Sequence, residues 1–212
     1  MRDRGQAHPG VERVMRAVAR AHLRTGAPIT VHTSAHAQTG LTAQEILRSE
    51  DVDLAAVVIG HSGDTSEPDY LHRLIDNGSY LGMDRFGPDV LLPTDQRVAV
   101  ATLARQGLAD RMVLSHDASC HIDWFPPGVR EQIAPNWHCT HLHDHVLPAA
   151  LQTGVTQAQL DTMLVDNPRR CFSPAKSWRH ATRRCRPERA QAARSDLVAE
   201  ATDRPLAGVG LP

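Results

Sequence analysis

Four short apolar segments recur along this chain at intervals of about 30 residues, the usual length of a strand–helix unit. Each segment is followed by a stretch with helical periodicity, and the four cover residues 28–32, 56–61, 80–84 and 111–117. Continuous apolar strands that alternate with helices are typical of a parallel sheet covered by helices on its outer face. The pattern predicts an α/β fold, half of a (β/α)8 barrel, with a small flavodoxin-like open sheet as the alternative.

The helical segments have recognisable faces and ends. Over residues 11–24, apolar residues recur at helical spacing, which predicts a helix with one apolar face formed by Val11, Val14, Met15 and Val18. Thr42 and Glu45 have the spacing of a capping box and predict a second helix that begins at about residue 42. Further helices are predicted over residues 67–77, over 94–106 with Thr94 as the cap, over 137–153, and from the capping box Thr156/Gln159 to Asn167-Pro168.

The apolar pattern stops at Pro174. Residues 174–212 contain eight Lys or Arg against four Asp or Glu and show no apolar periodicity. We therefore expect a partial barrel domain over residues 1–173 and a basic, unstructured tail over 174–212. The tail has a single aromatic residue, Trp178, so it is not expected to bind nucleic acid.

Composition excludes several classes of protein. The net charge is −1, and the chain has no apolar run long enough to span a membrane. The N-terminus has no apolar core of signal-peptide type. The four cysteines (Cys120, Cys139, Cys171 and Cys185) are far apart and form no CxxC pair. These features favour a reduced, cytoplasmic protein without a membrane or nucleic-acid partner.

Polar residues stand at the carboxyl ends of all four predicted strands: His32, His61, Asp84-Arg85 and His116-Asp117. In a barrel these ends converge on the active-site face. Histidine and aspartate are ligands for zinc, cobalt or iron. One histidine at a strand end is more often structural than a ligand. Four consecutive strands that end in this way bring the two interpretations to even odds.

Several motifs stand in the order and spacing of a known family. They are Val31-His32-Thr33, Ile59-Gly60-His61-Ser62-Gly63-Asp64-Thr65, Gly82-Met83-Asp84-Arg85-Phe86-Gly87 and Leu114-Ser115-His116-Asp117. With the closing Asn167-Pro168-Arg169-Arg170-Cys171-Phe172, they make residues 10–173 resemble the phosphotriesterase family of the amidohydrolase superfamily. The residues Asp84–Gly87 and Ile122-Asp123-Trp124 resemble the phosphotriesterase-like lactonases most. The resemblance covers only the C-terminal half of that barrel, strands five to eight.

The resemblance implies a role for each matching residue. His32 and His61 correspond to two ligands of the more exposed metal, and Asp117 to a ligand of the buried metal and the proton acceptor. Arg85 and Trp124 correspond to substrate-pocket residues. The implied cofactor is a pair of divalent ions, zinc first, with cobalt, iron or manganese as alternatives. A hydroxide bridging them would attack a lactone carbonyl or the phosphorus of an organophosphate triester, both small-molecule substrates.

Part of the family's metal site has no counterpart here. The family takes two histidines from an HxH motif on its first strand and a carboxylated lysine from its fourth. The only lysine of this chain is Lys176, in the tail. HxH does occur at His141/His143 and His143/His145, but inside a predicted helix, where i and i+2 do not share a face. A solvated helix face is the preferred interpretation of that cluster.

Two functions remain open. The first is a metal-dependent lactone or phosphotriester hydrolase, which is expected to be weakly active as this chain alone. The second is an inactive half-barrel remnant. Arg85 could instead pair with Asp84 or Asp89, Trp124 could be a loop-packing aromatic, and Cys120 is expected to be an inert thiol. Exposed sheet edges would favour self-association, so a homo-oligomer is also an open alternative.

Overall fold

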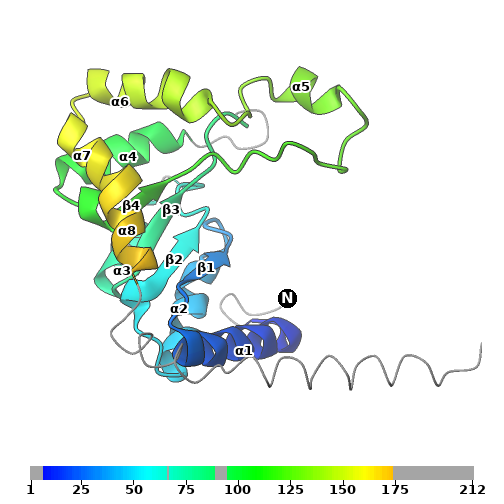
Figure 1. The fold of residues 1–212 in the computed structure, drawn as a ribbon, viewed down its shortest axis with the longest axis vertical. Helices are drawn as coiled ribbons and strands as arrows, with labels where there is room; N and C mark the ends of the chain where they lie inside the picture. The colour runs from blue at the N-terminus through cyan, green and yellow to red at the C-terminus, as the bar shows by residue number, and fades with distance from the viewer. Residues whose placement is uncertain (1–6, 66, 89–94, 174–212) are drawn as a thin grey trace, which may run out of the picture. The chain divides into compact units, whose positions relative to one another are not determined.

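A four-stranded parallel sheet lies at the centre of the computed structural model, which describes residues 7–65, 67–88 and 95–173 (Figure 1). Its strands follow one another in sequence order: β1 (Ile29–His32), β2 (Val57–Gly60), β3 (Tyr80–Met83) and β4 (Met112–Leu114). All three pairings are parallel. The predicted α/β fold with adjacent parallel strands is confirmed. The order β1-β2-β3-β4 also differs from the flavodoxin-like order, in which the first two strands are exchanged.

Helices connect and cover these strands. The α-helices are α1 (Pro9–Thr25), α2 (Thr39–Ser49), α3 (Pro68–Asp76), α4 (Gln96–Arg105), α5 (Val129–Ile133), α6 (Leu147–Gln152), α7 (Gln157–Asp161) and α8 (Asn167–Phe172). Short 3-10 turns, η1 (Leu54–Ala56) and η2 (Ala109–Arg111), precede β2 and β4. Two π-helical segments, η3 (Leu142–Val146) and η4 (Thr162–Asp166), precede α6 and α8.

The main core lies between the sheet and α2, α3 and α4. Alternate strand residues, among them Ile59, Leu81 and Met112, are buried in it with the apolar faces of these helices. Four apolar residues on one face of α3 (Tyr70, Leu71, Leu74 and Ile75) are all buried. On the other face of the sheet, Val58 and Tyr80 pack with Cys171 of α8 in a smaller cluster.

The helix predicted over residues 11–24 is confirmed as α1, and most of its apolar face is exposed. Val11, Val14 and Val18 are 53%, 63% and 40% exposed, and Met15 is half-buried. Ala19 is the buried residue of α1. On its polar side, Arg16 and Arg20 form ion pairs with Glu50, which follows α2. The periodicity identified an apolar stripe correctly, but the described chain contains nothing that covers it.

The start of α2 also differs from its prediction. The helix begins at Thr39 rather than at Thr42, which lies inside it. Residues 34–39 form a turn closed by the Thr39 amide, which donates to Ser34 O, and by the Ser34 amide, which donates to Thr39 Oγ1. Gly40 can then approach the core closely, because a Cβ atom there would lie 2.8 Å from Ile59 Cγ2. This packing fixes the first turn, and the capping-box spacing at Thr42 is coincidental.

Each of the last two helical stretches contains a proline, and at the second, Asn167-Pro168, the sequence predicts an end. Asn167-Pro168 does not stop the helix, which continues to Phe172, so that prediction is wrong. A proline lacks an amide hydrogen and crowds the preceding turn of an α-helix. The wider π-helical turn of η4 directly precedes Pro168, and η3 directly precedes Leu147-Pro148. The widened turns accommodate both prolines without a break.

Of three other predicted helix starts, one is confirmed, one lies outside the described residues and one is shifted along the chain. The capping box of Thr156 and Gln159 is confirmed at the start of α7. Asp95 caps α4 by accepting from the Arg97 amide, and the predicted cap Thr94 lies outside the described residues. The helix predicted from residue 137 begins at His141, because Trp137 Nε1 donates to Asp117 O and holds the preceding turns near β4.

The tail predicted over residues 174–212 lies outside the described residues, and its disorder stays a prediction. No helix in the described part of the chain is long and apolar enough to cross a membrane.

A substitution of Asn167 tests how the last helix is joined to the sheet. Its fully buried Nδ2 donates to Ala109 O and Met112 O at 2.8 and 2.7 Å. Asn167→Ala would remove both buried hydrogen bonds and leave Ala109 O with only the Met112 amide as a partner, so we expect a loss of about 1–3 kcal/mol in the free energy of unfolding. Urea unfolding followed by circular dichroism measures it.

Gln157→Ala is the control, because Gln157 is exposed and donates only within α7, to Asp161. It should change the free energy by less than about 0.5 kcal/mol. Equal losses in the two variants would contradict this account of Asn167.

Candidate metal and substrate site

Two histidines from neighbouring strands face each other at the carboxyl ends of the sheet. His32 is the last residue of β1, and His61 directly follows β2. His61 Nε2 and His32 Nδ1 are 2.9 Å apart, and the two rings meet edge-on with centroids 4.4 Å apart. The parallel register pairs His32 with Gly60, which places the two residues side by side. The convergence predicted for these strand ends is therefore present.

Asp84, which follows β3, holds His61 in place. Its carboxylate accepts from the His61 backbone amide at 3.0 Å and lies 2.9 Å from His61 Nδ1. His61 has a left-handed backbone, with φ of 61°, which turns its amide and its ring toward the same carboxylate. Such a conformation costs energy in a non-glycine residue and is common at functional sites. Sequence analysis placed Asp84 at a strand end but assigned it no role.

Two glycines make room for the Asp84 carboxylate. A Cβ atom at Gly82 would lie 3.0 Å from Asp84 Oδ2 and 2.9 Å from Gly60 Cα. A Cβ atom at Gly60 would lie 3.4 Å from the same oxygen. The carboxylate therefore lies close over the backbone of β2 and β3, and larger residues there would displace it.

Arg85 links two further carboxylates. Its Nη1 donates to Asp64 Oδ2 at 2.6 Å, and its Nε donates to Asp117 Oδ2 at 3.2 Å. The alternative pairing with Asp84 is not observed, and Asp89 lies outside the described residues. Gln96 of α4 completes the arrangement, since it accepts from the Arg85 amide and donates to Asp64.

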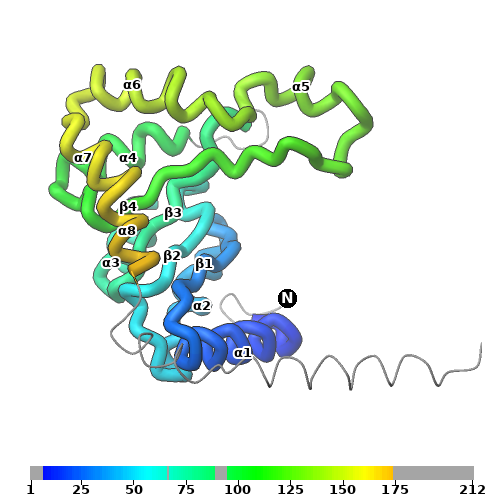
Figure 2. The backbone as a smooth tube through the Cα atoms, in the orientation of Figure 1, coloured from blue at the N-terminus to red at the C-terminus, as the bar shows by residue number. Residues whose placement is uncertain are grey.

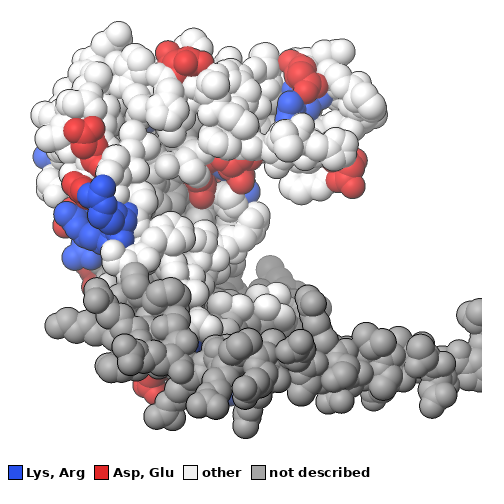
Figure 3. Space-filling view, in the orientation of Figure 1, with Lys and Arg blue, Asp and Glu red and all other residues white. Residues whose placement is uncertain are grey.

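Burial shifts the pKa values of two side chains in this cluster, Asp64 and His32. It raises the pKa of Asp64, an effect that the Arg85 guanidinium opposes. The pKa of His32 is lowered, first by burial and then by His61 and Arg85 nearby. A neutral His32 is the form that can bind a metal. Figure 3 shows acidic and basic atoms next to one another on the hollowed surface near the ends of β2 and β3.

Asp117 joins this cluster, whereas Trp124 does not. The Asp117 side chain is 39% exposed, and its Oδ2 lies 4.0 Å from His61 Nδ1. Its φ of 48° is also left-handed. Trp124 is 76% exposed. It belongs to the segment around α5, which projects from the sheet in Figure 2. No residue of α5 is buried. Neither a pocket wall nor a loop-packing role is visible for Trp124. His116 accepts from the Ala118 amide and stabilises a turn.

The donors present fit a metal ion only in part. His32 Nδ1 and His61 Nε2 converge as two ligands would, and a zinc–nitrogen bond measures about 2.0–2.1 Å. However, no group of three or more His, Cys, Asp or Glu within residues 7–65, 67–88 and 95–173 has the geometry to hold a metal. Two imidazoles are one donor short of the three that catalytic zinc usually has.

The helix formed by His141, η3 and α6, here called the outer helix, does not present its histidines on the single solvated face that the sequence predicts. His143 and His145 are exposed, but His141 is buried. The His141 ring lies 5.1 Å from that of His145 and 5.5 Å from that of His138, between centroids. The partners are therefore four and three residues apart, and the HxH spacing itself brings no pair together.

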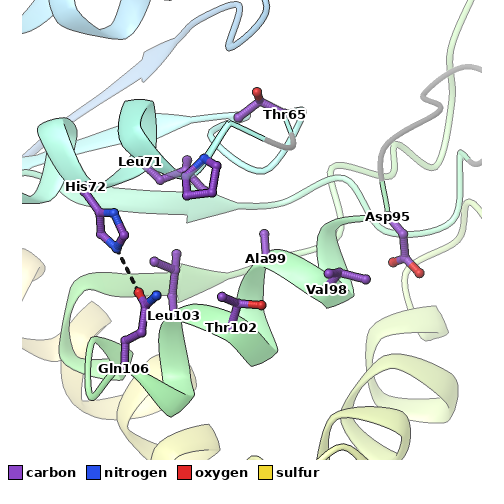
Figure 4. A pocket seen from close by; sticks show the side chains of 10 residues that line it. Thr65, Leu71, His72, Asp95, Val98, Ala99, Thr102, Leu103 and Gln106 are labelled. Atoms are coloured by element: carbon purple, nitrogen blue, oxygen red, sulfur yellow. Dashed lines mark hydrogen bonds between the residues drawn. The ribbon is translucent and has the colours of Figure 1, made fainter.

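A groove on the outer layer lies apart from these strand-end residues. It encloses about 340 Å³ between α3 and α4, with Leu71, Val98 and Leu103 among its walls (Figure 4). His72 Nε2 and Gln106 Oε1 are 2.8 Å apart at its end. None of His32, His61 or Asp117 lines it.

Comparison with known proteins identifies similar chains. The model of the phosphotriesterase family matches residues 2–172. The phosphotriesterase homology protein of Mycobacterium tuberculosis is 58% identical over 165 residues, which cover 77% of this chain and 51% of that protein. The aryldialkylphosphatase of Saccharolobus solfataricus is 39% identical over 166 residues, 77% of this chain and 53% of that protein.

Solved structures give the same result. The structure of the phosphotriesterase from Mycobacterium tuberculosis aligns with a TM-score of 0.76 and 56% identity, over 78% of this chain and 52% of that one. The organophosphorus hydrolase from Deinococcus radiodurans, also described as a PTE-like lactonase, aligns with a TM-score of 0.72 at 32–33% identity. The chain spans about half the length of the relatives it matches.

Asp84→Asn tests whether Asp84 positions the histidine pair. Loss of a partner that orients a metal-binding histidine typically lowers metal affinity about 10–100-fold, and we expect that range for zinc. Competition with a chelating dye measures the affinity. Asp161→Asn, an exposed carboxylate of α7, is the matched control and should leave it unchanged. Equal zinc affinity in Asp84→Asn and the unaltered chain would contradict the positioning role.

Proposed function

The chain belongs to the phosphotriesterase family, and we propose that it carries part of the site of a metal-dependent hydrolase acting on lactones or organophosphate triesters. The observation that carries this proposal is the His32–His61 pair, with facing nitrogens 2.9 Å apart and Asp84 behind His61. The names of the relatives, an aryldialkylphosphatase and a PTE-like lactonase, support the substrate classes.

Each residue has a task in this proposal. His32 and His61 would bind one divalent ion, through Nδ1 and Nε2 respectively. Asp117 would bind a second ion and accept the proton released during hydrolysis. The ions, zinc first and otherwise cobalt, iron or manganese, would acidify water and polarise the electrophile. Asp84 fixes the His61 ring, so that its Nε2 stays directed at His32.

Arg85 holds Asp117 ready for this role. Its Nε donates to Asp117 Oδ2 while its Nη1 is held by Asp64, so the guanidinium is fixed at both ends. A guanidinium fixed in this way orients the carboxylate beside it through a charge-assisted hydrogen bond. Arg85 would also contact substrate, and Trp124 would add an aromatic surface once a pocket encloses it.

The small number of metal-binding side chains limits the activity that we expect of the chain alone. The described residues offer one ion two imidazoles and the other a single carboxylate, below the usual three at catalytic zinc. Weakly held ions would also stabilise the fold little. We therefore expect weak or no turnover from the isolated chain, even with added zinc or cobalt. A non-catalytic remnant is the competing outcome.

The test compares the chain alone with a mixture. The probe is the part of the Mycobacterium tuberculosis relative that this chain does not match. With zinc or cobalt, the chain alone should hydrolyse a lactone and an aryl phosphotriester near background. The mixture should exceed it by more than about 100-fold, because the loss of a metal ligand costs more than the loss of a residue that only orients a ligand.

His61→Ala should abolish turnover in the mixture, whereas His143→Ala, an exposed histidine of the outer helix, should not. Robust turnover by the chain alone would overturn the expectation of weak activity. A stable, metal-loaded mixture without turnover would identify the remnant instead.

A further inference from the structure

The side chain of Gln96 is buried, although Gln96 is the first residue of α4, a helix outside the sheet. It is 2% exposed and reaches back from the helix to the residues behind the strand ends. Its Oε1 accepts from the Arg85 backbone amide at 3.2 Å, and its Nε2 donates to Asp64 Oδ1 at 2.6 Å. A backbone amide only donates and a carboxylate accepts, so these partners fix the orientation of the Gln96 amide. Both of its polar groups are thus satisfied, as burial requires.

Gly63 leaves the space that the Gln96 side chain occupies. A Cβ atom on Gly63 would lie 2.6 Å from Gln96 Cδ and 2.7 Å from Gln96 Oε1. The backbone of Gly63 is not left-handed, so the nearness of Gln96 excludes a side chain here, and backbone conformation does not. The turn between His61 and Asp64 therefore runs directly against the Gln96 amide.

Gln96 is the buried end of a line of polar side chains that leads outward through the site. Asp64 is bound to Gln96 through Oδ1 and accepts from Arg85 Nη1 through Oδ2. Arg85 Nε then donates to Asp117 Oδ2. The side chains of Asp64, Arg85 and Asp117 are 12%, 23% and 39% exposed, so exposure rises with each step away from Gln96. The direction of the Arg85 guanidinium is therefore set from the interior.

One terminal nitrogen of Arg85 takes no part in these contacts. Within the residues that the structure describes, Arg85 Nη2 has no hydrogen-bond partner, whereas Nε and Nη1 both have one. A guanidinium that is fixed through two nitrogens can offer the third to a bound molecule with little further loss of side-chain freedom. Phosphoryl and carbonyl oxygens are suitable acceptors.

We propose that Gln96 is a positioning residue of the strand-end site, which fixes Asp64 and the Arg85 backbone and so directs Arg85 Nη2 toward the phosphoryl or carbonyl oxygen of a substrate. This assignment rests on the proposed function and deepens it. A neutral amide suits the position better than a charged side chain. A glutamate would repel Asp64. A lysine would compete with Arg85 for Asp64 and would offer the Arg85 amide no acceptor.

A second buried glutamine, Gln44 of α2, has only a structural role. It is 0% exposed, its Nε2 donates to Leu74 O and Ser79 Oγ, and its Oε1 accepts from Asn77 Nδ2. These partners join α2 to α3 and to the turn before β3, and none of them is charged or belongs to the strand-end site. Gln96 differs because both of its partners belong to that site.

The test measures how firmly Arg85 is held in the metal-free full chain. Phenylglyoxal reacts with two nitrogens of a guanidinium, so the bonds of Arg85 to Asp64 and Asp117 slow its modification. Peptide mass spectrometry gives the rate at this one residue. Gln96→Met keeps the length of the side chain and removes both of its hydrogen bonds. We expect Arg85 to react about fivefold faster or more in this variant, because Asp64 loses its second partner.

Gln44→Met is the matched control, because it removes an equally buried amide that shares no partner with Asp64 or Arg85. It should change the Arg85 rate less than about twofold. The rate at Arg16, whose ion pairs lie outside the site, should be the same in Gln96→Met and the unaltered chain. An unchanged Arg85 rate in Gln96→Met, or an equal rise in Gln44→Met or at Arg16, would overturn the assignment.

Gly63→Ala is a second variant that remains informative if Gln96→Met does not fold. Its Cβ atom would displace the Gln96 amide without changing the chemistry of that amide, so Arg85 should again react faster. An unchanged Arg85 rate in a folded Gly63→Ala chain would count against the role of Gln96.

Turnover is measured separately, in the mixture with the unmatched part of the Mycobacterium tuberculosis relative. Gln96→Met should lower kcat/KM about tenfold or more, because a misdirected Arg85 binds the reacting group less well, and Gln44→Met should not. Unchanged turnover by Gln96→Met in an active mixture would overturn the assignment, even if Arg85 reacts faster. A mixture without any turnover would refute the proposed function, whereas the Arg85 rates would still decide whether Gln96 positions Arg85.

Discussion

The parallel register of β1–β4 places the carboxyl ends of all four strands along one edge of the sheet, and every polar contact of the candidate site depends on it. His32 is opposite Gly60, so the next residue, His61, comes within 2.9 Å of it. Asp84 follows β3 in the same way and reaches back to His61. Residues that are 29 and 23 positions apart in sequence are thus neighbours without any long loop.

Backbone shape adds to this register. The left-handed turn at His61 and the glycines of β2 and β3 allow one carboxylate to lie over the sheet and bind both the amide and the ring of the histidine. Arg85 extends the arrangement to Asp64 and Asp117. The side chains that would meet an ion or a substrate are therefore oriented by other side chains before either arrives, which lowers the cost of assembling a site.

The sequence was sufficient for the strand–helix alternation, the sheet order and the convergence of His32, His61 and Asp117. It was insufficient wherever the outcome depends on what an element packs against. The valines of α1 have the periodicity of a core face, but periodicity cannot say whether a partner is present. The true start of α2 depends on Gly40 packing under Tyr70 and Ile59. Pro168 is accommodated by a π-turn that composition does not reveal.

The same limit applies to the site. A motif placed Asp84 at a strand end, yet its bond to His61 depends on the turn between them and on glycines that leave space for it. Arg85 could have paired with several carboxylates, and only the fold selects Asp64 and Asp117. Trp124 matched a family motif, but its surroundings in this chain leave it exposed.

The most direct measurement of the central claim is X-ray absorption of the isolated chain loaded with one equivalent of zinc. If His32 and His61 form the ligand pair, the spectrum should show two imidazole nitrogens at about 2.0–2.1 Å, completed by oxygen donors. The imidazole scattering should fall in the His61→Ala chain. A spectrum with the same imidazole count in His61→Ala would place the metal elsewhere, for example on the histidines of the outer helix, and would contradict the account.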